Sequence, residues 1–217
     1  MKTRFWYDGS VASHTFFMAT SPTNKTIAVI GAGAVGSTLA YTLALKNIAS
    51  RIILIDINEQ KEEGEIMDIN DIMSFVETGS VVRGDFADAA QADIIIISAG
   101  TPQKSAGETR LELVNKNKGI LSSVFQQIGK PKPEAVVIVI SNPVDILAYH
   151  AQELAGLPKS QVFGTGTTLD TARLRTEVGL ALGVSASSVS GYVLGEHGDS
   201  EFVAWSTVKV GGVGADK

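Results

Sequence analysis

The sequence contains no cysteine among its 217 residues. Disulfide bonds, thiolate nucleophiles and zinc-thiolate centres are therefore excluded, and a cytoplasmic location is expected. The formal net charge is −5, and no run of basic residues interrupts the mixed charges. This pattern argues against binding to nucleic acid or to an anionic membrane through bulk electrostatics. The expected partners are small molecules, and no metal is expected.

The first 24 residues lack both strand alternation and helical periodicity. Their longest apolar run, residues 16–19, is too short for the roughly 7–15 residues of a signal-peptide core. A transit peptide would share the serine-rich composition, although Asp8 counts against that alternative. We therefore expect residues 1–24 to be a disordered tail.

Short runs of isoleucine and valine recur from Thr26 onward, and 44% of all residues are apolar. They show little polar alternation, which is typical of parallel strands covered by helices on both faces. The predicted strands are residues 26–30, 51–55, 81–82, 94–98 and 135–141.

Stretches with helical spacing lie between these strands. One carries Val35, Leu39 and Leu43, and others cover residues 109–127 and 144–155. The alternation predicts an α/β fold, a Rossmann-like doubly wound parallel sheet over residues 25–164. Residues 165–217, with another helix and a glycine-punctuated, strand-like stretch from Val189, predict the start of a second, α+β substrate domain.

A glycine-rich turn, GAGAVG at residues 31–36, follows the first predicted strand. Gly31 permits a tight turn, Gly33 allows backbone N–H groups to approach a pyrophosphate, and Gly36 lets the helix lie close to the sheet. A GxGxxG pattern alone is weak evidence, since glycine-rich turns are common on protein surfaces, but its position between strand and helix predicts dinucleotide binding. Val35 belongs to the same candidate cofactor site.

Three further positions are expected at the carboxyl ends of strands, where open α/β sheets bind ligands. Asp56 follows the second strand, and its carboxylate can accept hydrogen bonds from ribose hydroxyls while repelling a 2′-phosphate, which favours NAD over NADP. Ala99-Gly100 and Asn142 follow later strands. All belong to the predicted cofactor site.

Two polar motifs carry candidate chemistry in the second part of the chain. GEHGD at residues 195–199 places His197 in a short polar segment, and LDTAR at 169–173 places Asp170 and Arg173 on one helical face. Taken singly, these are a surface histidine and an intrahelical ion pair. Together, a carboxylate can orient an imidazole while a guanidinium binds a substrate carboxylate.

From residue 25 to about residue 209 the chain resembles the lactate and malate dehydrogenase family. The resemblance rests on the glycine-rich turn with Asp56, on AGTPQKSAGETR at 99–110, on SNPVD at 141–145, and on LDTAR with GEHGD. It implies an NAD-dependent oxidoreductase that interconverts (S)-lactate and pyruvate.

The same resemblance implies a role for each site residue. His197 would be the proton donor and acceptor, Asp170 its orienting partner, and Arg173 the carboxylate clamp. Asn142 would contact both substrate and cofactor. Arg110 would lie on a mobile loop and stabilise charge on the reacting oxygen. Members of the family are usually dimers or tetramers, so a homo-oligomer is expected for a complete chain.

Substrate choice is expected to depend on Gln103, because glutamine at this position resembles the lactate enzymes and arginine the malate enzymes. A neutral amide cannot neutralise a second carboxylate in a closed pocket. The loop that carries Gln103 is one residue longer than usual at Ser105-Ala106. Three alternatives stay open. The first is a dehydrogenase of bulkier, hydroxyisocaproate-like 2-hydroxy acids, which residues 191–194 and 201–206 resemble. Malate is the second alternative, and a catalytically incomplete, C-terminally truncated NAD-binding fragment is the third.

Overall fold

The computed structural model describes residues 25–76, 79–101 and 110–214. Within them, a six-stranded parallel sheet has the order β3-β2-β1-β4-β5-β6. The strands are β1 (Thr26–Ile30), β2 (Arg51–Ile55), β3 (Val81–Arg83), β4 (Ile94–Ile97), β5 (Val136–Val139) and β6 (Val162–Gly164). The order reverses between β1 and β4, which confirms the predicted doubly wound sheet and places a ligand crevice at that point.

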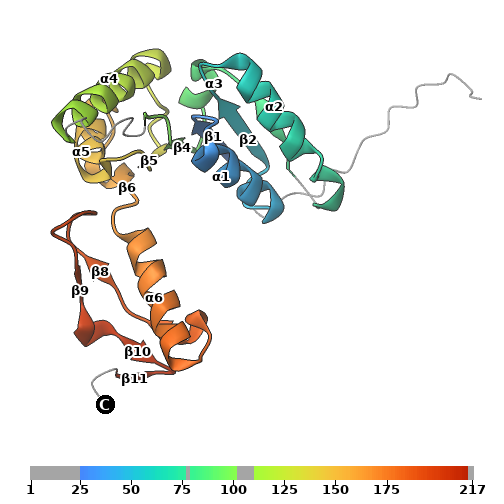
Figure 1. The fold of residues 1–217 in the computed structure, drawn as a ribbon. Coiled ribbons are helices and arrows are strands. Elements are labelled where there is room, and N and C mark those ends of the chain that lie inside the picture. The colour runs from blue at the N-terminus through green and yellow to red at the C-terminus, as the bar shows by residue number, and fades with distance from the viewer. Residues whose placement is uncertain (1–24, 77–78, 102–109, 215–217) are drawn as a thin grey trace, which may run out of the picture.

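Helices cover both faces of this sheet (Figure 1). Apolar side chains of α3 (Phe86–Ala90), α4 (Arg110–Ile128) and α5 (Val144–Leu154) pack on one face. Those of α1 (Ala34–Leu45) and α2 (Glu59–Asn70) pack on the other. Successive strand residues point to opposite faces, so Ala28 joins one apolar cluster and Val29 the other. Burial on both faces is why these strands are almost wholly apolar.

The second part of the described chain is built around α6 (Thr168–Leu182). Figure 1 shows this helix leaving the sheet after β6, with short strands beside it. An antiparallel sheet has the order β11-β10-β7, and β8 pairs with β9. Their bounds are β7 (Val189–Ser190), β8 (Val193–Leu194), β9 (Phe202–Val203), β10 (Lys209–Val210) and β11 (Val213–Gly214). Single 3₁₀ turns occupy Met73–Phe75, Lys159–Gln161, Ala186–Ser188 and Trp205–Thr207.

The elements missed by sequence reasoning are short or polar. Helix α2 buries only Glu62 and Ile69, so it has no apolar stripe to predict it. It is held partly by an ion pair at 3.3 Å between Glu62 and Arg83 of β3. Strand β6 has only three residues, too few for a pattern of apolar positions to predict it.

The amino ends of three strands are joined by one carboxylate. Asp93 accepts hydrogen bonds from the backbone N–H of Thr26 at 2.8 Å and from the ammonium groups of Lys132 at 2.7 Å and Lys25 at 3.2 Å. Burial raises the pKa of Asp93, but these donors outweigh it and lower the pKa to about 2. This cluster lies at the amino ends of the strands, on the opposite side of the sheet from the carboxyl ends that form the ligand crevice, and it stabilises the fold.

No helix in the described ranges is long and apolar enough to cross a lipid bilayer.

Candidate active site

The glycine-rich turn connects β1 to α1, and its glycines meet different surroundings. A Cβ atom on Gly36 would lie 1.8 Å from the carbonyl oxygen of Gly31. One on Gly31, whose φ is +107°, would lie 2.7 Å from the backbone nitrogen of Ala99. By contrast, a Cβ on Gly33 would meet no atom of the described residues within 4 Å. The space at Gly33 is open, as the close approach of a phosphate to backbone N–H groups requires.

Asp56 directly follows β2 and holds this turn. Its Oδ2 accepts a hydrogen bond from Ala32 N at 2.7 Å, and its Oδ1 accepts one from Asn58 N at 2.9 Å. The carboxylate also lines a cleft of about 380 Å³ together with Gly31, Gly33 and Ala99. Glycines, an open phosphate position and an acceptor at the end of the second strand are together suited to a dinucleotide.

Two further clefts continue from this one along the carboxyl ends of the strands. A cleft of about 340 Å³ shares Gly100 with the first and is lined by Val35 and Asn142. A cleft of about 420 Å³ shares Asn142 with the second and is lined by His197. The predicted acid–base histidine and most of the predicted cofactor residues, though not Gly36, therefore line adjacent clefts that share residues.

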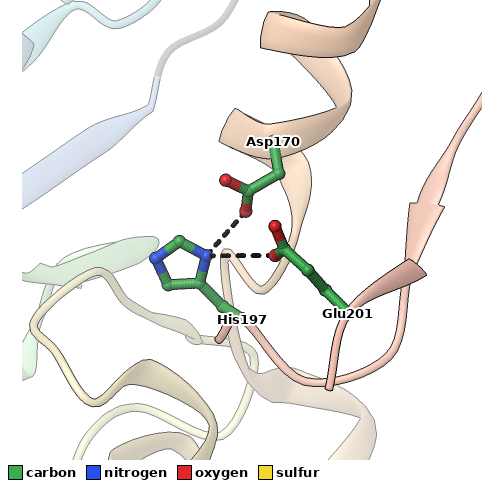
Figure 2. Close-up of side chains that lie close together, drawn as sticks. All are labelled: Asp170, His197 and Glu201. Carbon is green, nitrogen blue, oxygen red and sulfur yellow. Dashed lines mark hydrogen bonds and ion pairs between the residues drawn. The ribbon is translucent and has the colours of Figure 1, made fainter. Parts of the chain in front are cut away.

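His197 and Asp170 form a short polar contact in the site. Nδ1 of His197 lies 2.6 Å from Oδ2 of Asp170, and Figure 2 shows the other ring nitrogen on the opposite side of the imidazole. A carboxylate at this distance holds a proton on Nδ1 and leaves Nε2 for exchange with a ligand. Burial raises the pKa of Asp170, but the hydrogen bond and charge of His197, assisted by Arg173, lower it below its usual value.

Arg173 lies one helical turn after Asp170, and its Nη1 is 3.1 Å from Oδ1 of that carboxylate. The side chain of Arg173 is 63% exposed. The ion pair weighed in the sequence analysis is therefore present, and its guanidinium still has donors facing solvent. Arg173 can therefore pair with Asp170 and still bind a substrate carboxylate.

A second carboxylate, Glu201, approaches the same nitrogen. Its Oε2 lies 3.8 Å from Nδ1 of His197 (Figure 2) and has no hydrogen-bond partner among the residues that the structure describes. One possible metal-ligand atom from each of Asp170, His197 and Glu201 lies within 4.8 Å of the other two, close enough for all three to bind one metal ion. However, the 2.6 Å contact commits Nδ1 to Asp170, so the arrangement is better suited to moving a proton than to binding a cation.

Hydrogen bonds from neighbouring elements fix the loop that carries His197. Oδ2 of Asp145, at the start of α5, accepts from His197 N at 2.8 Å. Thr171 of α6 accepts from Val193 N at 3.0 Å, just before the loop. Sequence reasoning assigned no role to Asp145 or Thr171. An acidic residue in the first turn of a helix was the available signal for Asp145, but nothing local marked its partner.

Asn117 of α4 was also missed. It is 3% exposed and hydrogen bonds to the backbone of Thr101 and of Asn142. The signal was a polar residue on an otherwise apolar helical face. Two predicted site residues are not placed by the structure: Gln103 and the side chain of Arg110 lie outside what it describes.

A doubly wound sheet with a glycine-rich turn, an acceptor after its second strand and a carboxylate-oriented histidine defines a dinucleotide-dependent α/β protein. The comparison with known families is more specific. Residues 25–164 match "lactate/malate dehydrogenase, NAD binding domain", and residues 167–217 match "lactate/malate dehydrogenase, alpha/beta C-terminal domain". The chain belongs to the lactate/malate dehydrogenase family.

Curated relatives agree with this assignment. An L-lactate dehydrogenase of Acetivibrio thermocellus is 46% identical over 193 residues, covering 89% of this chain and 61% of the relative. One of Clostridium botulinum is 44% identical over 191 residues, covering 88% of this chain and 60% of the relative. The chain thus spans about three-fifths of the length of these relatives.

Solved structures are equally similar. A lactate dehydrogenase from a Medee basin deep-sea metagenome library, MGS-M5, has a TM-score of 0.83 at 41% identity, covering 89% of this chain and 62% of that one. The minor L-lactate dehydrogenase of Enterococcus mundtii in its ligand-bound form has a TM-score of 0.83 at 43% identity, covering 88% and 61%. The resemblance stated from the motifs is confirmed, and with it the NAD-binding class of the first domain.

Proposed function

We propose that this protein acts as an NAD-dependent L-lactate dehydrogenase, which reduces pyruvate to (S)-lactate and catalyses the reverse oxidation. The observation that carries the proposal is the 2.6 Å contact between His197 and Asp170 at the end of the connected clefts. Relatives named L-lactate dehydrogenase at 44–46% identity support the substrate.

The cofactor would be held by the first domain, residues 25–164. The backbone at Gly31, Gly33 and Gly36 would receive the pyrophosphate, with Val35 beside it, and Asp56 would accept from the adenosine ribose. Ala99, Gly100 and Asn142 would line the path toward His197. When bound, the reduced nicotinamide supplies the hydride.

His197 would carry the proton. As the carbonyl carbon of pyruvate is reduced, the electron pair of its C=O bond moves to oxygen, and protonated His197 donates its Nε2 proton there. The imidazole that remains is held by the hydrogen bond from its Nδ1 to Asp170. In the oxidative direction, neutral His197 removes the hydroxyl proton of lactate.

The remaining residues would position the substrate. Arg173 belongs to the second domain, residues 165–217, and Arg110 and Asn142 belong to the first. Arg173 has exposed guanidinium donors that match a carboxylate in two parallel hydrogen bonds. Arg110 would stabilise negative charge on the reacting oxygen, the role that the family resemblance implies. Asn142 lines two of the clefts and would contact both ligands.

Pyruvate is proposed over oxaloacetate because Gln103 offers no positive charge for a second carboxylate. The size of the substrate side chain is the finer question, since Phe202 and Trp205 belong to the segment 201–206 that resembles enzymes of bulkier 2-hydroxy acids. We also propose a cytoplasmic homo-oligomer, which light scattering of the purified protein and cell fractionation would test.

The proposed activity is tested with NADH and three substrates: pyruvate, 2-oxoisocaproate and oxaloacetate. The expected order of kcat/KM places pyruvate first. His197→Asn should abolish turnover while NADH still binds, measured by calorimetry. Binding of NADH without turnover of any substrate by the unmodified protein would reject the proposed activity in favour of a non-catalytic NAD-binding fragment.

A further inference from the structure

Helix α4 carries one amide on its buried face. The buried positions Leu121, Val124, Phe125 and Ile128 follow Asn117 at helical spacing, and Asn117 itself is 3% exposed. An amide at such a position would be destabilising unless its donors and acceptor were paired.

All the principal hydrogen-bonding groups of Asn117 are paired, and every partner is backbone. Its Oδ1 accepts from Thr101 N at 2.9 Å. Its Nδ2 donates to the carbonyl oxygen of Asn142 at 2.7 Å and to that of Thr101 at 3.2 Å. One side chain therefore joins the segments that follow β4 and β5.

These two segments lead into the candidate site. Thr101 precedes Gln103 by two positions, and it lines the first and second clefts. Asn142 lines the second and third clefts, the third together with His197. Asn117 also lines the second cleft, and a Cβ on Gly100 would lie 3.5 Å from its Oδ1.

We propose that Asn117 is a positioning residue for the reaction: its side-chain amide fixes the backbone at Thr101 and Asn142 so that the oxo-acid and nicotinamide groups meet His197 in register. The inference rests on the proposed dehydrogenase function. Small displacements of such groups cost catalytic rate out of proportion to their effect on stability. Asn117 itself need not touch the reacting atoms.

Asn117→Asp is the informative variant, because it changes only the amide nitrogen. The carboxylate keeps an acceptor for Thr101 N but loses both donations and faces two carbonyl oxygens. When protonated, it regains one donor. Burial raises the pKa of a carboxyl group, so protonation occurs within an accessible pH range.

The expected result at neutral pH is a loss of about tenfold or more in kcat/KM for pyruvate, with NADH affinity changed far less. The ratio of variant to wild-type kcat/KM should then rise as the pH is lowered. Asn117→Leu, which cannot donate at any pH, should show the loss without the recovery. Amide hydrogen exchange at Thr101 should be faster in Asn117→Leu, which removes the acceptor of the Thr101 N–H, and much less affected in Asn117→Asp, which keeps it; this readout is independent of turnover.

Asn115→Asp is the matched control, since Asn115 is exposed on the same helix and undergoes the same change of charge. It should behave as wild type throughout. Variants of Asn117 that only lower the melting temperature, with unchanged KM and kcat per folded molecule and a flat pH ratio, would overturn the proposal. If wild type reduces none of the three oxo acids, the proposed function fails first and the positioning role falls with it.

Discussion

Nδ1 of His197 lies 2.6 Å from Oδ2 of Asp170, although 27 residues separate the two along the chain. The helix α6 supplies the carboxylate and the loop between β8 and β9 supplies the imidazole (Figure 2). The contact makes Asp170 the nearer of the two carboxylates at Nδ1, since Oε2 of Glu201 lies 3.8 Å away.

Replacing Asp170 with asparagine should lower kcat/KM for pyruvate by roughly 10²–10⁴-fold, because the neutral amide neither fixes the Nδ1 proton nor stabilises the imidazolium. NADH affinity should be retained, since Asp170 lies outside the cleft that Asp56 lines. Steady-state kinetics with calorimetry would measure both. Glu177→Gln, an exposed change of the same kind on α6, is the control; equal losses in the two variants would contradict the assignment.

Two glycines of the turn should respond differently to the same substitution. Gly36→Ala places a methyl group 1.8 Å from a backbone oxygen, so it should lower the melting temperature markedly. Gly33→Ala meets open space and should fold normally, yet lose NADH affinity because the methyl group occupies the phosphate position. Thermal unfolding and NADH titration separate the effects. Undiminished NADH binding by Gly33→Ala would argue against a pyrophosphate at this turn.

Asp56→Ala should weaken NADH binding by about 10–100-fold, the cost of losing a charged hydrogen-bond acceptor. Part of this loss comes from the turn, because Asp56 also accepts from Ala32 N. Discrimination against NADPH should decrease, since the negative charge that repels a 2′-phosphate is removed. The ratio of the two dissociation constants is the measurement, with exposed Asp68→Ala as control. An unchanged ratio would count against the ribose role.

Gln103→Arg should shift preference from pyruvate toward oxaloacetate, because it supplies a counter-charge for the second carboxylate. The measured quantity is the oxaloacetate-to-pyruvate ratio of kcat/KM. Gln126→Arg, on the exposed side of α4, adds the same charge elsewhere and should leave the ratio unchanged. If Gln103→Arg does not increase this ratio, the longer loop at Ser105-Ala106 places residue 103 away from the second carboxylate.

Asp93 predicts a pH dependence of stability. Its pKa falls from the usual 3.8 to about 2 in the folded protein, so its stabilising contribution is complete above about pH 5 and is lost as the pH falls toward 2. At neutral pH, Asp93→Asn should be less stable by about 2 kcal/mol. Urea unfolding at a series of pH values should show the difference from wild type shrinking below pH 4. A difference independent of pH would contradict this account.

The sequence predicted the sheet well because its physical signal is local. The unbroken run Ile94–Ile97 can be satisfied only by burial on both faces, and β4 is the central strand of the sheet beside β1. Helix α4 was predicted within one residue at each end. Helix α2 was not, because its fully buried positions are only Glu62 and Ile69, which form no apolar stripe.

The site was predicted only in part. His197 and Asp170 were paired by their complementary chemistry and by the family resemblance, since no spacing in the chain brings them together. The contacts of Asp145 and Asn117 are made to backbone atoms of distant segments. Every residue has the same backbone groups, so the sequence does not show which of them a side chain contacts. Such residues are identified only from the structure.

The Asp93 cluster and the glycine-rich turn lie at opposite ends of strand β1. Strand β1 separates the cluster from the glycine-rich turn by five residues, about 16 Å of extended chain. That exceeds the screening length of about 8 Å at physiological ionic strength. Solvent-exposed charges at the amino ends of the strands can therefore be redesigned with little effect on the electrostatics of the glycine-rich turn.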